Sequence, residues 1–213
     1  MADNSLTWTG DPEAGRPYLE HALSMCRPNS VSSRIVSFLN LQTVADIDFA
    51  DGRSYYTKSG YFTYLDDSSV DRLVEAVSCM PSSETQIELA YLGGAAARMA
   101  AKETAFGDRS LFFIMNLLAQ WSDPSADTVN TSWIRGLFNT FRPAMKPGGY
   151  VNFMSGDEQH RVQEAYQERW DRMVAVKTHY DPNRFFRLNQ ECSTKETRHD
   201  STCIARRKPE RLR

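Results

Sequence analysis

Residues 110–121 read SLFFIMNLLAQW and are apolar on both faces. This run is about half as long as a helix that crosses a bilayer, and Asp123-Pro124 ends it. A continuous apolar stretch between chain-breaking residues is typical of a strand in the middle of a sheet. We therefore predict a buried central strand, in which the polar residues Asn116 and Gln120 lie on one face because side chains alternate along a strand.

A second predicted strand carries polar residues in the same way. Residues 85–91 read TQIELAY, which alternates with a period of two and places Gln86 and Glu88 on one face, and two glycines at 93–94 end it. Burying such groups without partners costs about 1–3 kcal/mol each. Either a ligand site lies over this polar sheet face, or the polar residues satisfy one another and nearby loop backbone.

Helical patterns alternate with the strands. Residues 68–80, 129–142 and 157–180 have apolar residues at helical spacing, and a proline lies close to the end of each. Residues 48–65 are rich in strand formers, with Gly52 and Gly60 as turn points, and residues 150–153 form a short segment. The spacing predicts an α+β fold, a mostly antiparallel sheet with helices packed on one face.

Composition excludes several classes of protein. The chain has 213 residues, 41% of them hydrophobic, and a net charge of −2, which argues against a nucleic-acid binder. No segment is apolar enough for a membrane helix or a secretory signal, so we expect a cytoplasmic protein with no membrane partner. Residues 191–213 are basic and almost without apolar residues, which predicts a disordered tail.

The common catalytic motifs are missing from the sequence. It contains no GxSxG, P-loop, HExxH or GxGxxG motif, and its 4 histidines lie far apart. Its 4 cysteines are scattered as well, without the spacing of a metal site. We therefore predict no metal centre.

Several segments resemble the berberine-bridge-enzyme-like FAD-linked oxidases, and they occur in that family's order. Residues 149–153 read GYVNF, similar to the family's GxYxN segment, and residues 177–190 read KTHYDPNRFFRLNQ, similar to its closing KxxYDPxxxFRxNQ. Upstream, residues 55–61 read YYTKSGY, which resembles the family's yyKSGy element. The resemblance spans roughly residues 8–190, and the closing motif is its most specific part.

The resemblance implies a flavoprotein of the vanillyl-alcohol-oxidase superfamily. Such proteins bind FAD with an N-terminal half, usually through a histidine in an RxGGH-type loop, and cover the flavin with the sheet of a substrate domain. This chain has no GGH loop. We therefore expect a partial substrate-binding domain over residues 1–148 and a berberine-bridge-like C-terminal segment over residues 149–190, without the FAD-binding half.

The resemblance also assigns candidate site residues. Glu88 and Tyr150 are the catalytic candidates, and Tyr150 and Asn152 are the candidates for contacting FAD. The substrate-binding candidates lie on the polar sheet face and after the GxYxN match: Gln86, Asn116, Gln120 and Phe153. Phe153 occupies the position where sugar-oxidising relatives have the tyrosine that acts as base, and a phenyl ring cannot accept a proton. Tyr150 and Phe153 could instead be core aromatics, and Asn152 a turn cap.

The function implied is oxidation of an alcohol, a sugar or a secondary metabolite by hydride transfer to FAD. The expected partner is the small-molecule substrate. Two alternatives remain open: a non-catalytic remnant that keeps the binding face, or one subunit of a split enzyme completed by a separate FAD-binding chain.

Overall fold

A computed structural model describes residues 5–25, 27–49, 51–100, 103–106, 109, 113–187, 190–192 and 205–206. The first residues of the predicted central strand, 110–112, and most of the predicted tail lie outside these residues. The chain divides into two compact units, Met1–Asp48 and Phe49–Arg213. Residues 149–190, expected as a separate segment, therefore belong to the same unit as the sheet.

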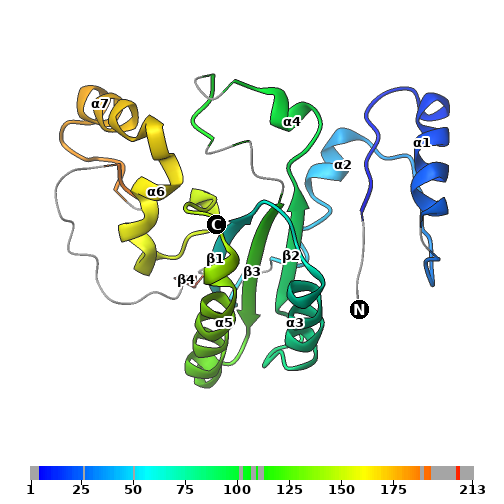
Figure 1. Ribbon diagram of the computed structural model, residues 1–213, viewed down its shortest axis with the longest axis horizontal. Coiled ribbons are helices and arrows are strands. Elements are labelled where there is room, and N and C mark those ends of the chain that lie inside the picture. The colour runs from blue at the N-terminus through cyan, green and yellow to red at the C-terminus, as the bar shows by residue number, and fades with distance from the viewer. Residues whose placement is uncertain are drawn as a thin grey trace, which may run out of the picture. The chain divides into compact units, whose positions relative to one another are not determined.

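The second unit is built on an antiparallel sheet with the strand order β2-β3-β1-β4 (Figure 1). Its strands are β1 (Ser54–Phe62), β2 (Gln86–Tyr91), β3 (Phe113–Trp121) and β4 (Ala205–Arg206). The predicted central strand is confirmed, because β3 lies between β1 and β2 and is buried along almost its whole length.

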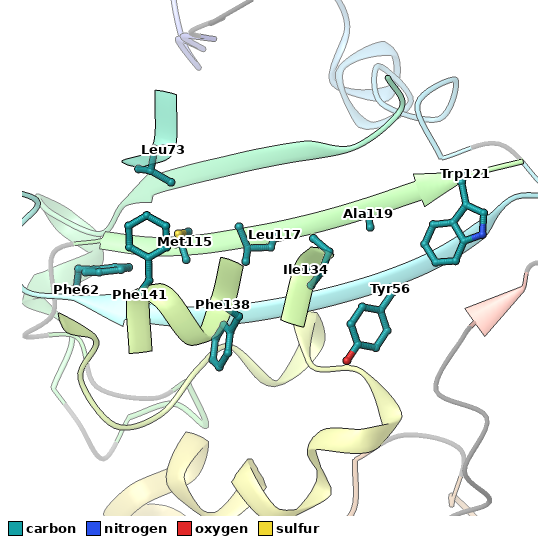
Figure 2. Packing of buried hydrophobic residues seen from close by; sticks show 10 residues of the cluster. All are labelled: Tyr56, Phe62, Leu73, Met115, Leu117, Ala119, Trp121, Ile134, Phe138 and Phe141. Atoms are coloured by element: carbon teal, nitrogen blue, oxygen red, sulfur yellow. The ribbon is translucent and has the colours of Figure 1, made fainter. Parts of the chain in front are cut away.

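Two helices, α3 (Asp67–Ser78) and α5 (Asp127–Phe141), cover one face of this sheet (Figure 1). Alternate residues of β3 enter the apolar core between the sheet and the helices, among them Met115 and Leu117. Figure 2 shows this core, to which α5 contributes Ile134, Phe138 and Phe141. The structure confirms the α+β class with helices on one face.

The outer edge of β1 is closed by later parts of the chain. The Ser155 hydroxyl accepts a hydrogen bond from Thr57 N (2.9 Å) and donates one to Thr57 O (2.8 Å). Lys146 N donates to Tyr61 O (2.9 Å), and β4 pairs with the start of the strand. These contacts satisfy backbone groups that would otherwise offer an open edge for aggregation.

The long helix predicted over residues 157–180 is wrong as a single element. The structure breaks it into η4 (Gly156–Arg161), α6 (Val162–Tyr166), η5 (Gln167–Arg169) and α7 (Trp170–Tyr180). Glu158 and Gln167 leave helical geometry, the latter with a φ of 49°. Glu158 forms ion pairs with Lys58 of β1 and with Arg161, so contacts to the sheet override the helical pattern here.

One further local prediction needs correction. Gly60 lies inside β1, not at a turn, and a Cβ there would come within 2.4 Å of the Met145 sulfur. Residues 151–153 form a 3-10 turn, η3 (Val151–Phe153). Gly52 does lie outside the strands and has a φ of 86°, as a turn residue would.

The beginning of the predicted tail is folded in the structure. Glu191 and Cys192 are buried, and Glu191 forms an ion pair with Arg184. The side-chain amide of Gln159 bonds both backbone groups of Glu191, donating to its O (2.7 Å) and accepting from its N (3.1 Å). The folded segment therefore reaches at least Cys192.

The first unit contains α1 (Pro12–Ser24) and α2 (Phe38–Gln42). Asp11 caps α1 by accepting a hydrogen bond from Glu13 N (3.1 Å). The Trp8 ring stacks on Tyr18 with centroids 4.9 Å apart and covers Gly15, where a Cβ would come within 2.5 Å of the indole. Only glycine fits beneath the indole ring.

The remaining short elements are α4 (Ala95–Arg98), η1 (Pro124–Ala126) and η2 (Arg142–Ala144). Among the described residues, none of the helices is long and apolar enough to span a bilayer.

Candidate functional site

The two faces of the sheet differ sharply in chemistry. Because side chains alternate, the residues of β3 between those of the core point away from α3 and α5. We call this second side of the sheet the polar face; its residues from β2 and β3 include Gln86, Glu88, Ile114, Asn116, Leu118 and Gln120. The strand register places Gln86, Glu88, Asn116 and Gln120 on one face, as the alternation in the sequence predicts.

Asn116 and Glu88 form the centre of the polar face. They are direct partners in the register of β2 and β3, and Asn116 Nδ2 donates a hydrogen bond to Glu88 Oε2 (2.9 Å). Asn116 is only 2% exposed, whereas Glu88 is exposed. Asn116 Oδ1 is buried and has no protein partner. The pair therefore presents a carboxylate oriented by an amide, next to an acceptor able to bind a donor group.

Gln120 lies on the same face, four residues further along β3. It is 1% exposed, and its Oε1 accepts a hydrogen bond from Arg53 Nη1 (3.5 Å). Gln120 Nε2 is buried without a protein partner. Leaving such a group unpaired costs about 1–3 kcal/mol, so a ligand hydroxyl or carbonyl that accepts from Nε2 would recover that free energy.

Aromatic side chains gather at the other end of the polar face. The Tyr150 ring packs against the cluster of Tyr61 and Ile114, and Ile114 precedes Asn116 by two residues on the same face. The Tyr150 centroid lies 5.4 Å from that of Phe106 and 5.2 Å from that of Phe153.

Asn152 is exposed and lies beside this aromatic group. Its Nδ2 donates a hydrogen bond to the Tyr150 hydroxyl oxygen (2.8 Å). The tyrosine proton therefore remains available for a ligand. Tyr150 N in turn donates to Ser59 Oγ (3.4 Å), which ties the loop to β1.

A cluster of charged residues lies at the β1 edge, on the side of α5. We call it the charged cluster: Lys58, Arg135, Asp157, Glu158 and Arg161. The Tyr56 hydroxyl donates to Asp157 Oδ2 (2.7 Å) and accepts from Arg135 Nε (2.9 Å).

The charged cluster shifts two ionisation equilibria. Burial, followed by the hydrogen bond to Asp157, raises the pKa of Tyr56 well above its ordinary value. Burial also acts to raise the pKa of Asp157, but the hydrogen bond from Tyr56 and the charge of Lys58 outweigh it, so that pKa is lowered. The carboxylate of Asp157 is therefore held in its charged form.

The structure thus brings most of the predicted site residues onto one face and separates them into two groups. Glu88, Asn116 and Tyr150 lie toward the aromatic end, with Phe153 and Asn152 at its rim, while Gln120 lies at the far end. Gln86 is exposed and stands opposite Leu118 in the register.

Sequence reasoning missed Arg53 and Ser59, which contact Gln120 and Tyr150. No local pattern marks either residue, because both contacts join distant parts of the chain. Arg109 donates hydrogen bonds to Ala96 O (2.9 Å) and Thr104 Oγ1 (2.9 Å), and so supports the loop between β2 and β3.

Within the part of the chain that the structure describes, no group of His, Cys, Asp or Glu side chains is arranged to hold a metal ion.

The family model described as "Berberine and berberine like" matches residues 149–191. This part of the chain is therefore similar to the family that the model describes. The match begins at the predicted start of the C-terminal segment and ends at the buried Glu191. We call residues 149–191 the berberine-like segment.

Curated relatives extend the similarity over most of the chain. An uncharacterized FAD-linked oxidoreductase of Bacillus subtilis, YgaK, is 27% identical over 174 residues, which cover 81% of this chain and 38% of that protein. An FAD-linked oxidoreductase of Dictyostelium discoideum is 22% identical over 85% of this chain and 40% of its own length. The chain thus spans about two fifths of the length of these relatives.

Solved structures show the same fold. BBE-like 1 of Physcomitrella patens superposes with a TM-score of 0.68 at 18% identity, covering 88% of this chain and 44% of that one. A variant of berberine bridge enzyme, described as a reticuline dehydrogenase, gives a TM-score of 0.60 at 20% identity, covering 67% and 33%. The resemblance seen in the sequence, which is to one portion of a berberine-bridge-enzyme-like oxidoreductase, is confirmed.

Proposed function

We propose that this chain forms the substrate-binding part of an FAD-dependent oxidoreductase that oxidises a hydroxyl-bearing small molecule. The observation that carries the proposal is that two amide atoms are buried on the polar face without protein partners: Asn116 Oδ1 beside Glu88, and Gln120 Nε2 at the far end of the face. The similarity to FAD-linked oxidoreductases supports the choice of reaction class.

The residues present fit the ring portion of a flavin. Tyr150, Phe106 and Phe153 offer apolar ring surface, and the exposed amide of Asn152 can bond the polar edge of a flat heterocycle. Tyr150 and Asn152 are therefore the residues that would contact FAD. When bound, FAD would accept a hydride, that is two electrons and one proton, from the substrate carbon.

The residues of the polar face would perform the remaining steps. Asn116 Oδ1 would accept a hydrogen bond from a substrate donor, and Gln120 Nε2 would donate one to a substrate acceptor. Gln86, opposite Leu118, and Phe153, beside Tyr150, are the further candidates for substrate contact. Glu88, oriented by Asn116 Nδ2, accepts the proton of the substrate hydroxyl as the carbon loses its hydride, which leaves a carbonyl product. The Tyr150 hydroxyl can donate a hydrogen bond to the substrate oxygen before the reaction.

The first experiment measures flavin in the native protein. The genomic copy would be tagged at the end of this sequence, and the protein purified under native conditions for visible spectroscopy and mass determination. We expect a flavin spectrum and release of FAD on denaturation. A colourless protein without a flavin-carrying partner would contradict the proposal and support a binding module without redox chemistry.

The same preparation tests whether a separate chain supplies the flavin. If FAD is carried on a second, co-purifying polypeptide, the proposal holds in the form of a split enzyme. If FAD is carried on the polypeptide that contains this sequence, the enzyme is a single chain.

A further inference from the structure

The two glycines before Tyr150 lie directly against strand β1. Gly148 has a φ of 106°, and a Cβ there would come within 3.2 Å of Glu164 O. A Cβ on Gly149 would come within 2.9 Å of Ser59 O and 3.3 Å of Arg161 Nη2. The chain that leads into Tyr150 is therefore confined between β1 and the guanidinium of Arg161.

Arg161 joins this glycine pair to the strand. Its Nη2 donates to Gly148 O (2.8 Å) and to Ser59 O (3.2 Å), so one nitrogen links both backbones. Ser59 Oγ accepts the hydrogen bond from Tyr150 N. Ser59 therefore contacts both groups: its carbonyl oxygen accepts from Arg161, and its hydroxyl oxygen accepts from Tyr150 N.

The guanidinium is itself held in place. Arg161 Nη1 donates to Glu158 Oε1, whose carboxylate also pairs with Lys58 Nζ (3.3 Å). The guanidinium carbon lies 4.8 Å from the centre of the Phe138 ring of α5. Arg161 is 7% exposed and Glu158 is 1% exposed, so solvent screens this pairing little.

We propose that Arg161 is a positioning residue for Tyr150, fixing the tyrosine at the polar face from the charged cluster on the other side of β1. The catalytic meaning of this role rests on the proposed function, whereas the placement of Tyr150 does not. A planar guanidinium can bind two carbonyls and a carboxylate together, which a lysine ammonium does with far less geometric definition.

The test observes Tyr150 directly. Fluorotyrosine incorporated at position 150 of the full chain reports its surroundings by fluorine NMR, with no need for flavin. We expect Arg161→Lys to shift or split the fluorine signal of Tyr150 in a protein that still unfolds cooperatively on heating. An unchanged Tyr150 signal in folded Arg161→Lys protein would overturn the proposal.

A matched variant separates positioning from general support of the fold. Arg135→Lys alters another arginine of the charged cluster, one that bonds Tyr56 and Asp157. We expect it to leave the Tyr150 signal unchanged, and an equal shift in this variant would also overturn the proposal. If Arg161→Lys does not fold, Glu158→Gln takes its place, because it keeps the guanidinium but removes its ion partner. A shifted Tyr150 signal in this variant would support the proposal, and an unchanged signal would overturn it.

A kinetic measurement on the flavin-loaded protein distinguishes this inference from the proposed function. A misplacement of about 1 Å can lower a rate by about a hundredfold, so we expect Arg161→Lys to lower kcat by about ten- to a hundredfold. A moved Tyr150 signal in a protein that shows no flavin chemistry would leave the positioning role intact and contradict the proposed function alone.

Discussion

The two faces of strand β3 use neighbouring residues in opposite ways. On the helix side, Met115, Leu117 and Ala119 are fully buried in an apolar cluster. On the polar face, Asn116 and Gln120 are equally buried, yet each leaves one amide atom without a protein partner. The side chains on the helix side are fully packed, whereas the polar face has two buried amide atoms that can still form hydrogen bonds with a ligand.

This difference separates stability from function along a single strand. Buried polar groups are normally paired, so the unpaired amide atoms of the polar face cost stability as long as no ligand pairs them. Substitutions on the two faces should therefore have different consequences for stability and for flavin chemistry.

The largest effect is expected from truncation on the helix side. Leu117→Ala leaves a cavity in the core and should lower the free energy of unfolding by about 2–5 kcal/mol. Leu118→Ala is the matched control, because Leu118 is 5% exposed but belongs to the polar face. In denaturant titrations we expect Leu118→Ala to lower the free energy of unfolding less than Leu117→Ala does, by about 2 kcal/mol. Equal losses would show that the two faces are packed alike.

An intermediate effect is expected where the charged cluster joins the segment after α5 to β1. Asp157→Asn removes the charge that pairs with Lys58 and Arg135 and should lower the free energy of unfolding by about 1–3 kcal/mol near neutral pH.

The pH dependence follows from the lowered pKa of Asp157. A carboxyl whose pKa is lower in the folded state stabilises the fold above its unfolded pKa and loses this contribution as the pH falls. Wild-type stability should therefore decrease as the pH falls below about 4, and Asp157→Asn should flatten that decrease. Parallel pH profiles for the two proteins would remove Asp157 from this role.

The smallest effect on stability is expected on the polar face. Asn116→Leu removes a group that is already half unpaired, so the free energy of unfolding should change by no more than about 1 kcal/mol. Flavin reduction by substrate should slow at least about tenfold, which corresponds to about 1.4 kcal/mol.

The control for Asn116→Leu is Asn130→Ala. Asn130 of α5 is also 1% exposed with an unpaired Oδ1, but it lies outside the polar face. We expect Asn130→Ala to leave flavin reduction unchanged. If both variants slowed it equally, an unpaired amide would not mark the site.

Much of this arrangement could be predicted from local pattern. The apolar run of residues 110–121 and the alternation of residues 85–91 predict strands β3 and β2, which the structure forms over residues 113–121 and 86–91. Alternation also predicts that the polar residues of each strand share a face, and the register then pairs Glu88 with Asn116. Helix α5 follows from apolar residues at helical spacing. These features depend on neighbouring residues only, which a single sequence shows directly.

The parts that could not be predicted depend on contacts between distant residues. Residues 157–180 have a helical pattern, but ion pairs of Asp157 and Glu158 with Lys58, about a hundred positions away, set their geometry. Arg53 reaches Gln120 only because the register of β1 and β3 brings them together. The position of Tyr150 likewise depends on Ser59 and Arg161, which no spacing rule connects.

The most direct test of the central claim, that the polar face performs flavin-dependent oxidation, is the rate of flavin reduction by substrate in the absence of oxygen. Glu88→Gln would be compared with wild type and with Glu75→Gln, which changes an exposed glutamate of α3. We predict a loss of about a hundredfold for Glu88→Gln, the usual effect of removing a general base, and none for Glu75→Gln. Unchanged flavin reduction in Glu88→Gln would contradict the account.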